Sequence, residues 1–126
     1  MNRFGWCIAI LALSACVEEP VDGRRAYQQD CAGCHGVDGQ GAGDFGAMLV
    51  KVPPDLTTLS RRNGGIFPRD YVMSTIDGLH RPEDFSAAMP EFGAGDMGEI
   101  LMIETTPVPS RLWALADYLE SIQKDG

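Results

Sequence analysis

Two cysteines and one histidine lie within a single short stretch, Cys31-Ala32-Gly33-Cys34-His35. Thiolate and imidazole groups bind metal ions, and two thiols at this spacing can also form a redox-active disulfide. A structural zinc site takes four nitrogen or sulfur ligands, usually from two clusters, but this chain has one cluster and a single further histidine, His80. A thioredoxin-like redox pair would lie in a βαβ pattern, and none surrounds these residues. Neither interpretation uses the whole motif.

Attachment of c-type haem does use both cysteines and the histidine. Two thiols one helical turn apart can each form a thioether with a vinyl group of the porphyrin, and the adjoining His35 then becomes the proximal ligand of the iron. Cys7 lies in a predicted leader and Cys16 is predicted to carry lipid, as described next, so Cys31 and Cys34 are the two thiols left for this chemistry. We therefore predict one covalent haem c.

The start of the chain, MNRFGWCIAILALSAC, has the pattern of an export signal. Arg3 precedes an apolar run from Phe4 to Leu13, which is too short to span a bilayer comfortably but fits the apolar region of a signal peptide. The stretch Leu13-Ser14-Ala15-Cys16 resembles the lipobox of bacterial lipoproteins. In those proteins the signal is cut just before the cysteine, whose sulfur carries a diacylglyceryl group.

This resemblance implies that residues 1–15 are a signal peptide and that Cys16 is the lipidated N-terminus. Residues 16–22 would then be a short tether, and residues 23–126 the haem domain. The domain would be exported and held by lipid at the periplasmic face of a bacterial membrane. The alternative is ordinary cleavage after Ser14, which would release a soluble exported protein.

With this motif and this leader, the chain resembles the class I c-type cytochromes, which are small single-haem electron carriers. The resemblance runs from about Val21 to Gln123, and its landmarks are CAGCH at 31–35, PPDLT at 53–57, AAMP at 87–90 and a closing amphipathic helix. It implies an all-α cytochrome c fold, with three to five helices wrapped around one covalently attached haem. It also implies a carrier of single electrons rather than an enzyme.

A haem iron bound by one histidine needs a second axial ligand or stays open to external ligands. The candidates in this sequence are Met48, Met73, Met89, Met97, Met102 and His80. Met89 lies far enough from His35 for the chain to pass around the haem edge, and Pro90 stiffens the turn beside it. In the family, a methionine followed by proline in this late loop is the usual distal ligand. We therefore predict Met89, with bis-histidine ligation through His80 as the alternative.

The resemblance also assigns a role to Pro54. A ligating histidine normally donates its other N–H to a carbonyl, which fixes the ring, and the family places that carbonyl on Pro54. The locked φ of proline suits a carbonyl that must keep one direction. Pro53-Pro54 would also separate two segments of the chain, with or without that role.

Four helices are expected to position these residues. Asp22 can cap a helix from Gly23 through Tyr27 toward the cysteines, and Asp55 can cap a second over residues 56–62. A third is expected over residues 68–77, and a fourth is expected to be capped by Ser110. The fourth carries an apolar stripe of Leu112, Leu115, Ala116, Leu119 and Ile122.

The family implies that this last helix crosses the first, with Gly23 allowing close approach and Tyr27 meeting Tyr118 or its neighbours. Residues 98–109 match the family less well and are expected to be a surface loop or an insertion, in which ILMIETT could form a short extended piece. The expected pocket walls are Phe67, Ile76 and Leu79. Arg61 or Arg62 would pair with a haem propionate or stay solvated.

The charge balance bears on partners. The chain has 10 basic and 18 acidic residues, a formal net charge of −8, and removal of Arg3 with the leader leaves 9 basic against 18 acidic residues, or −9. Acidic proteins are poor binders of a phosphate backbone, so nucleic acid is excluded as a partner. A redox protein with a positive docking surface fits better, although acidity can also serve solubility alone. A short lipid tether would place the donor and acceptor at a membrane, as separate complexes.

Two other classes of function remain open at this point. One is a haem subunit fixed within a larger membrane redox complex. The other is a haem enzyme or ligand sensor with an open sixth coordination site.

Overall fold

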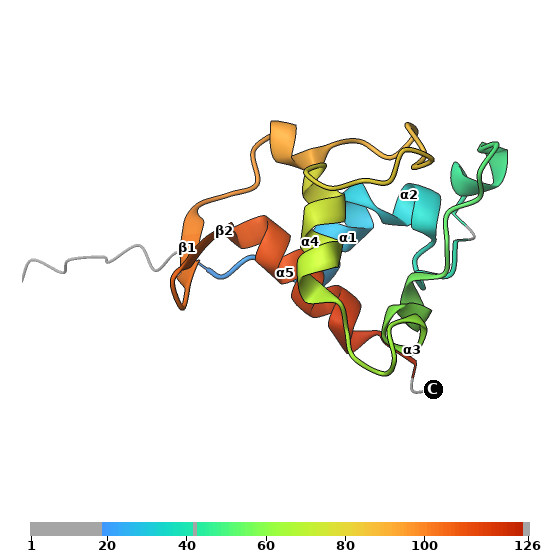
Figure 1. The fold of residues 1–126 in the computed structure, drawn as a ribbon. Coiled ribbons are helices and arrows are strands. Elements are labelled where there is room, and N and C mark those ends of the chain that lie inside the picture. The colour runs from blue at the N-terminus through green and yellow to red at the C-terminus, as the bar shows by residue number, and fades with distance from the viewer. Residues whose placement is uncertain (1–18, 42, 125–126) are drawn as a thin grey trace, which may run out of the picture.

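The computed structural model describes residues 19–41 and 43–124, which form a mostly helical domain with one small hairpin (Figure 1). The α-helices of this part of the chain are α1 (Gly23–Asp30), α2 (Ala32–His35), α3 (Leu59–Arg62), α4 (Arg69–Asp77) and α5 (Ser110–Ser121). The 3-10 helices are η1 (Gly46–Met48), η2 (Leu56–Thr58) and η3 (Phe92–Ala94), and the strands are β1 (Ile100–Ile103) and β2 (Thr106–Pro109). Within these residues no helix is both long and apolar enough to cross a bilayer.

Three predicted helix ends lie where the sequence places them. The side chain of Asp22 accepts a hydrogen bond from the Arg25 N–H at 3.1 Å, and Asp55 accepts one from the Thr57 N–H at 2.8 Å. Such caps satisfy backbone donors that have no partner within the first turn. Gly78, with a φ of 100°, ends α4 in the left-handed conformation that glycine adopts readily.

Ser110 is not the cap of α5, contrary to the prediction. Pro109 occupies the N-cap position, and Ser110 is the first helical residue without a capping hydrogen bond from its side chain. Because Pro109 also ends β2, the chain turns directly from strand to helix, and the fixed φ of proline suits that turn. The Ser110 N–H donates to the Glu99 carbonyl at 2.8 Å, which ties the helix to the start of the hairpin.

The segment 98–109 contains an antiparallel hairpin rather than an irregular loop. Strand β1 pairs with β2 in a register that sets Ile100 opposite Pro109. All four residues of β1 are apolar, so the sequence lacks the polar and apolar alternation that marks a half-buried strand. Val108 is buried, whereas Ile100 and Met102 are exposed.

The first and last helices cross at short range in the centre of the core (Figure 1). A Cβ atom on Gly23 would lie 2.0 Å from the Ala114 carbonyl oxygen, so the approach depends on glycine. Tyr27 is fully buried, and its ring centroid lies 5.1 Å from that of Tyr118. The predicted crossing is therefore confirmed. The α5 stripe is buried as predicted at Leu112, Leu115, Ala116 and Leu119, and Ile122 packs half-buried against the core.

Helix α4 packs on α5 and carries the chain back toward the cysteines. Val72 and Ile76 are its buried residues. At its start, Arg69 forms ion pairs with Asp117 and Glu120, and its guanidinium lies 4.5 Å from the centroid of the Trp113 ring. These contacts fix α4, so the loop that begins at its far end has a defined starting point.

Candidate functional site

The motif at 31–35 forms one helical turn directly after α1. The Cys31 N–H donates to the Tyr27 carbonyl, and the His35 N–H donates to the Cys31 carbonyl, each at 2.9 Å. Residues three and four positions apart lie on one side of such a turn, which groups both cysteines with the histidine. The Tyr27 hydroxyl donates to the Gly36 carbonyl at 2.7 Å, so the end of the turn is fixed to the core.

These three residues line one cavity of about 310 Å³. Its other walls come from the segment before η2, from α4 and from the loop after α4, and they include Val52, Pro54, Tyr71, Phe85, Met89 and Phe92. Most of these side chains are apolar, as is usual for a cofactor site. The structure thus brings together the attachment motif, Pro54 and Met89.

The surroundings of Cys31 are unlike those of a redox-active cysteine. Burial, with a smaller contribution from Asp30, raises the pKa of Cys31 to about 12, whereas reactive cysteines have lowered pKa values. Cys31 and Cys34 are not joined by a disulfide. Across residues 19–41 and 43–124, no group of three or more His, Cys, Asp or Glu side chains could hold a metal ion.

The imidazole of His35 is suited to bind iron in its neutral form. Burial lowers its pKa, and the nearby Pro54 carbonyl raises it by a smaller amount. The Nδ1 atom is buried and has no partner at full hydrogen-bond geometry, so the Pro54 contact is a close approach rather than a formed bond. This proximity supports the predicted role of the Pro54 carbonyl as hydrogen-bond acceptor for the His35 ring.

The loop after the motif braces the prolines against His35. The Gly41 N–H donates to the His35 carbonyl, and the Leu56 N–H donates to the Gly39 carbonyl, each at 2.7 Å. Gly41 has a φ of 87°, and a Cβ atom there would lie 2.4 Å from the Pro53 carbonyl oxygen. Glycine alone combines this conformation with this approach at low cost.

We expect Gly41→Ala to displace the Pro53-Pro54 segment and to lower the free energy of unfolding. Left-handed strain of about 1–2 kcal/mol and a collision of similar cost with the Pro53 carbonyl add to about 3 kcal/mol. Gly64→Ala is the matched control, because Gly64 has a φ of 70° and no atom within 4 Å of the added Cβ. Denaturant unfolding of both variants gives the two losses in free energy of unfolding. Equal losses would show that the close approach of Gly41 to Pro53 does not stabilise the domain.

The candidate axial ligands differ sharply in position. Met89 lines the cavity together with His35. Met97 is buried in the core and Met73 packs against it, whereas Met48 and Met102 are 72% and 64% exposed. His80 is also exposed and is absent from the cavity walls. The arrangement favours Met89, whose ligation of the iron stays a prediction.

The predicted pocket walls were wrong. Phe67, Ile76 and Leu79 do not line the cavity; Phe67 and Ile76 belong to the core and Leu79 is exposed. Neither predicted arginine reaches it, and Arg62 instead donates to the Asp55 carbonyl at 2.7 Å. The aromatic walls that sequence reasoning missed are Tyr71, Phe85 and Phe92. Phe85 and Phe92 lie on either side of the AAMP stretch in the sequence. That position, next to the predicted ligand Met89, is the signal that could have identified them as cavity walls.

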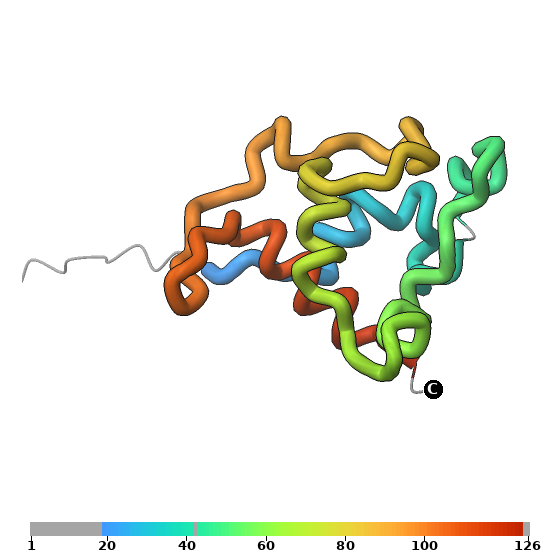
Figure 2. Tube along the Cα trace, viewed as in Figure 1, coloured from blue at the N-terminus to red at the C-terminus, as the bar shows by residue number. Residues whose placement is uncertain are grey.

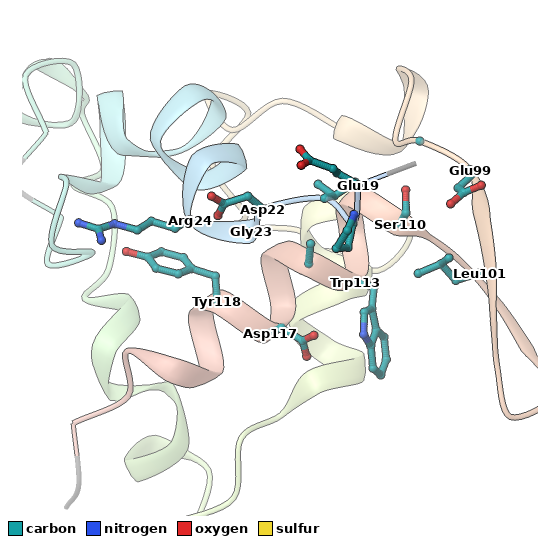
Figure 3. A pocket seen from close by; sticks show the side chains of 14 residues that line it. Glu19, Asp22, Gly23, Arg24, Glu99, Leu101, Ser110, Trp113, Asp117 and Tyr118 are labelled. Carbon is teal, nitrogen blue, oxygen red and sulfur yellow. The ribbon is translucent and has the colours of Figure 1, made fainter. Parts of the chain in front are cut away.

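A larger cavity, of about 770 Å³, lies where the described chain begins (Figure 3). It lies between residues 19–24, the start of the hairpin and α5, with Glu19, Glu99, Ser110 and Trp113 around it. Among residues 19–41 and 43–124, no cysteine, histidine or methionine lines it. It is therefore separate from the candidate site.

A family model described as Cytochrome c matches residues 20–123. The chain belongs to the cytochrome c family. Comparisons with curated proteins and with solved structures found no match. Membership implies a covalently attached haem c and electron transfer, and cytochromes c are typically carriers rather than enzymes. The predicted fold class and the predicted cofactor are thereby confirmed.

The residues of this cytochrome fit the haem of the family. Cys31 and Cys34 offer two thiols for addition to the vinyl groups, next to an imidazole whose pKa is lowered by burial. In the same cavity, Met89 offers a thioether sulfur, which is a common second ligand in cytochromes c. The apolar walls between them would exclude water from the porphyrin faces.

Proposed function

We propose that this cytochrome carries single electrons between redox proteins outside the cytoplasm. Cys31 and Cys34 attach the haem, while His35 and Met89 bind its iron. The observation that carries the proposal is one cavity lined by both thiols, the imidazole and the Met89 side chain. With two axial ligands supplied by the protein, the site suits electron transfer better than ligand sensing or catalysis.

Each group of the chain has a distinct task in this proposal. The haem supplies the one-electron couple of its iron. The thioethers keep it in place through repeated turnover, and the Pro54 carbonyl orients the His35 ring by accepting its free N–H. Apolar side chains such as Phe85 and Phe92 lower the local polarity, which affects the reduction potential.

We propose further that lipid on Cys16 holds the domain at the periplasmic face of a bacterial membrane. Residues 1–18, including the signal peptide 1–15 and Cys16, lie outside the described residues. From Cys16 to the start of α1 at Gly23 the chain can extend at most about 20–25 Å, so the domain stays near the bilayer. Its redox partners are then membrane complexes or proteins that dock at that surface.

The position of the tether also constrains how partners approach. Residues 19–24 lie beside the hairpin, whereas α2 and its cysteines lie toward the other end of the domain (Figure 1). A lipid at Cys16 would therefore hold the domain with its haem cavity turned away from the attachment point. The donor and acceptor complexes would reach the haem with those of their domains that project from the membrane. Their docking surfaces would be positive, to match the acidic chain.

Intact mass spectrometry of the mature protein tests attachment and anchoring together. We expect a chain that begins at Cys16 and carries both one haem and acyl chains. In Cys16→Ser the haem should remain, while the acyl chains disappear. A wild-type chain that begins at Ala15 without acyl groups would show ordinary cleavage and overturn the anchor, leaving the electron-carrier proposal intact.

A further inference from the structure

The loop that carries Met89, residues 79–91, starts and ends at the same end of α4. A Cβ atom on Gly78 would lie 2.7 Å from the Glu91 side chain, and one on Gly93 would lie 2.2 Å from the Asp77 carboxylate. Figure 2 shows the two limbs of the loop running side by side from the end of α4. Loops with such close ends keep their shape through contacts made inside them.

Arg81 makes the contacts that close this loop. Its Nε donates to the Thr75 carbonyl in α4 at 3.0 Å, its Nη1 donates to the Met89 carbonyl at 2.8 Å, and its Nη2 donates to the Pro90 carbonyl at 2.5 Å. One guanidinium thus joins the helix to the backbone of the proposed iron ligand. Its carbon also lies 4.7 Å from the centroid of the Phe85 ring, which lines the cavity.

The chemistry of these contacts favours arginine over other residues. A planar guanidinium presents its N–H groups in a fixed fork, so it can bind several carbonyls at once, whereas a lysine ammonium is a compact charge on a flexible stem. The Thr75 carbonyl belongs to the last turn of α4, where carbonyls lack partners within the helix and a positive charge is favourable.

We propose that Arg81 is a positioning residue for the sixth ligand. It fixes the Met89 backbone relative to α4, so that the side chain of Met89 stays directed toward the cavity and its sulfur stays on the iron. The proposal rests on the ligation of iron by Met89 described under the proposed function. It assigns to Arg81 a role in keeping the sixth site closed to external ligands.

The test compares Met89→Ala, Arg81→Ala and Arg81→Lys as holoproteins with the wild type. The readouts are the sulfur-to-iron charge-transfer band of the oxidised form and the rate at which carbon monoxide binds the reduced form. Met89→Ala should lose the band and bind carbon monoxide readily. Arg81→Ala should raise the fraction of molecules with Met89 off the iron about 30-fold, as expected when the two hydrogen bonds to the Met89 and Pro90 carbonyls are lost, with a similar gain in the rate of carbon monoxide binding.

Arg81→Lys keeps the positive charge but loses the planar arrangement of N–H donors. It keeps the proposal testable if the alanine variant does not fold. We expect its band to weaken on warming well below the temperature of global unfolding. The matched control is Arg62→Ala, because Arg62 also binds backbone carbonyls, but those of Asp55 and Thr58, which lie outside the loop that carries Met89. This control should keep the wild-type band and the wild-type rate.

The outcomes separate the two proposals. If Met89→Ala keeps the band, Met89 is not the ligand and the ligation itself is wrong. If Met89→Ala loses it but both Arg81 variants match the wild type in band and carbon monoxide rate, the ligation stands and the role of Arg81 is refuted. If Arg62→Ala opens the site as much as the Arg81 variants, the effect is general loss of stability and the positioning role is likewise refuted.

Discussion

Replacing both Cys31 and Cys34 by serine is expected to abolish covalent haem attachment. A serine hydroxyl is too weak a nucleophile to add across a vinyl group under conditions in which a thiol does so. The apolar cavity of about 310 Å³ would then lack a fixed occupant. At about 24 cal/mol per Å³, an empty cavity of that size costs at most about 7 kcal/mol, which is comparable to the whole stability of a small domain.

The measurement is acid–acetone extraction followed by intact mass spectrometry. Extraction should strip all colour from the double variant, while the wild type keeps its haem mass. Cys31→Ser and Cys34→Ser alone are the controls, since each keeps one thiol and His35 and should retain haem through one thioether. Haem mass that survives extraction in the double variant would show that the attachment residues are wrongly assigned.

Gly23→Ala is expected to destabilise the domain although it improves the helix locally. Gly23 is the first residue of α1, and alanine favours a helix over glycine by up to about 1 kcal/mol. The added Cβ would lie 2.0 Å from the Ala114 carbonyl oxygen and 3.1 Å from the Tyr118 Cβ, so α1 and α5 must move apart. Overpacking of this kind costs about 1–3 kcal/mol or more, and the obstacle here is backbone, which cannot rotate away. With a cost at the upper end of this range and the helical gain subtracted, we expect a net loss of about 2 kcal/mol.

Thermal unfolding checks this prediction, because both the direction and the size of the change in Tm are predicted. A loss of about 2 kcal/mol lowers Tm by roughly 8–15 °C in a domain of this size. Gly95→Ala is the control, because Gly95 has a φ of −104° and the nearest atom to an added Cβ is 3.5 Å away. That variant should stay within about 0.5 kcal/mol of the wild type. A Gly23 variant more stable than wild type would mean that the helices do not cross so closely.

The sequence was most informative where the chemistry is contiguous. The haem motif is a single helical turn, so Cys31, Cys34 and His35 could be assigned before any fold was known. The caps at Asp22 and Asp55 and the stripe of α5 were predictable for the same reason, since each depends on residues within a few turns.

The sequence was least informative where distant segments meet. The aromatic walls Tyr71, Phe85 and Phe92 come from α4, from the loop that follows it and from η3, and their meeting depends on the path of that loop. The contacts of Arg81 with backbone carbonyls depend on the same path and carry no side-chain signature. The extended piece predicted in ILMIETT is β1, but its pairing with β2 was missed because β1 is apolar throughout and lacks a strand alternation. The direct passage of β2 into α5 places Pro109, not Ser110, at the N-cap.

The close crossing of α1 and α5 has a consequence for the order in which this protein assembles. Helix α1 has only eight residues, and helices that short are marginal in water without a partner. That partner is encoded near the other end of the chain, so a segment synthesised or translocated only as far as residue 109 contains the cysteines but not the helix that holds α1. The two thiols and the imidazole therefore reach their native arrangement only after α5 has emerged and docked.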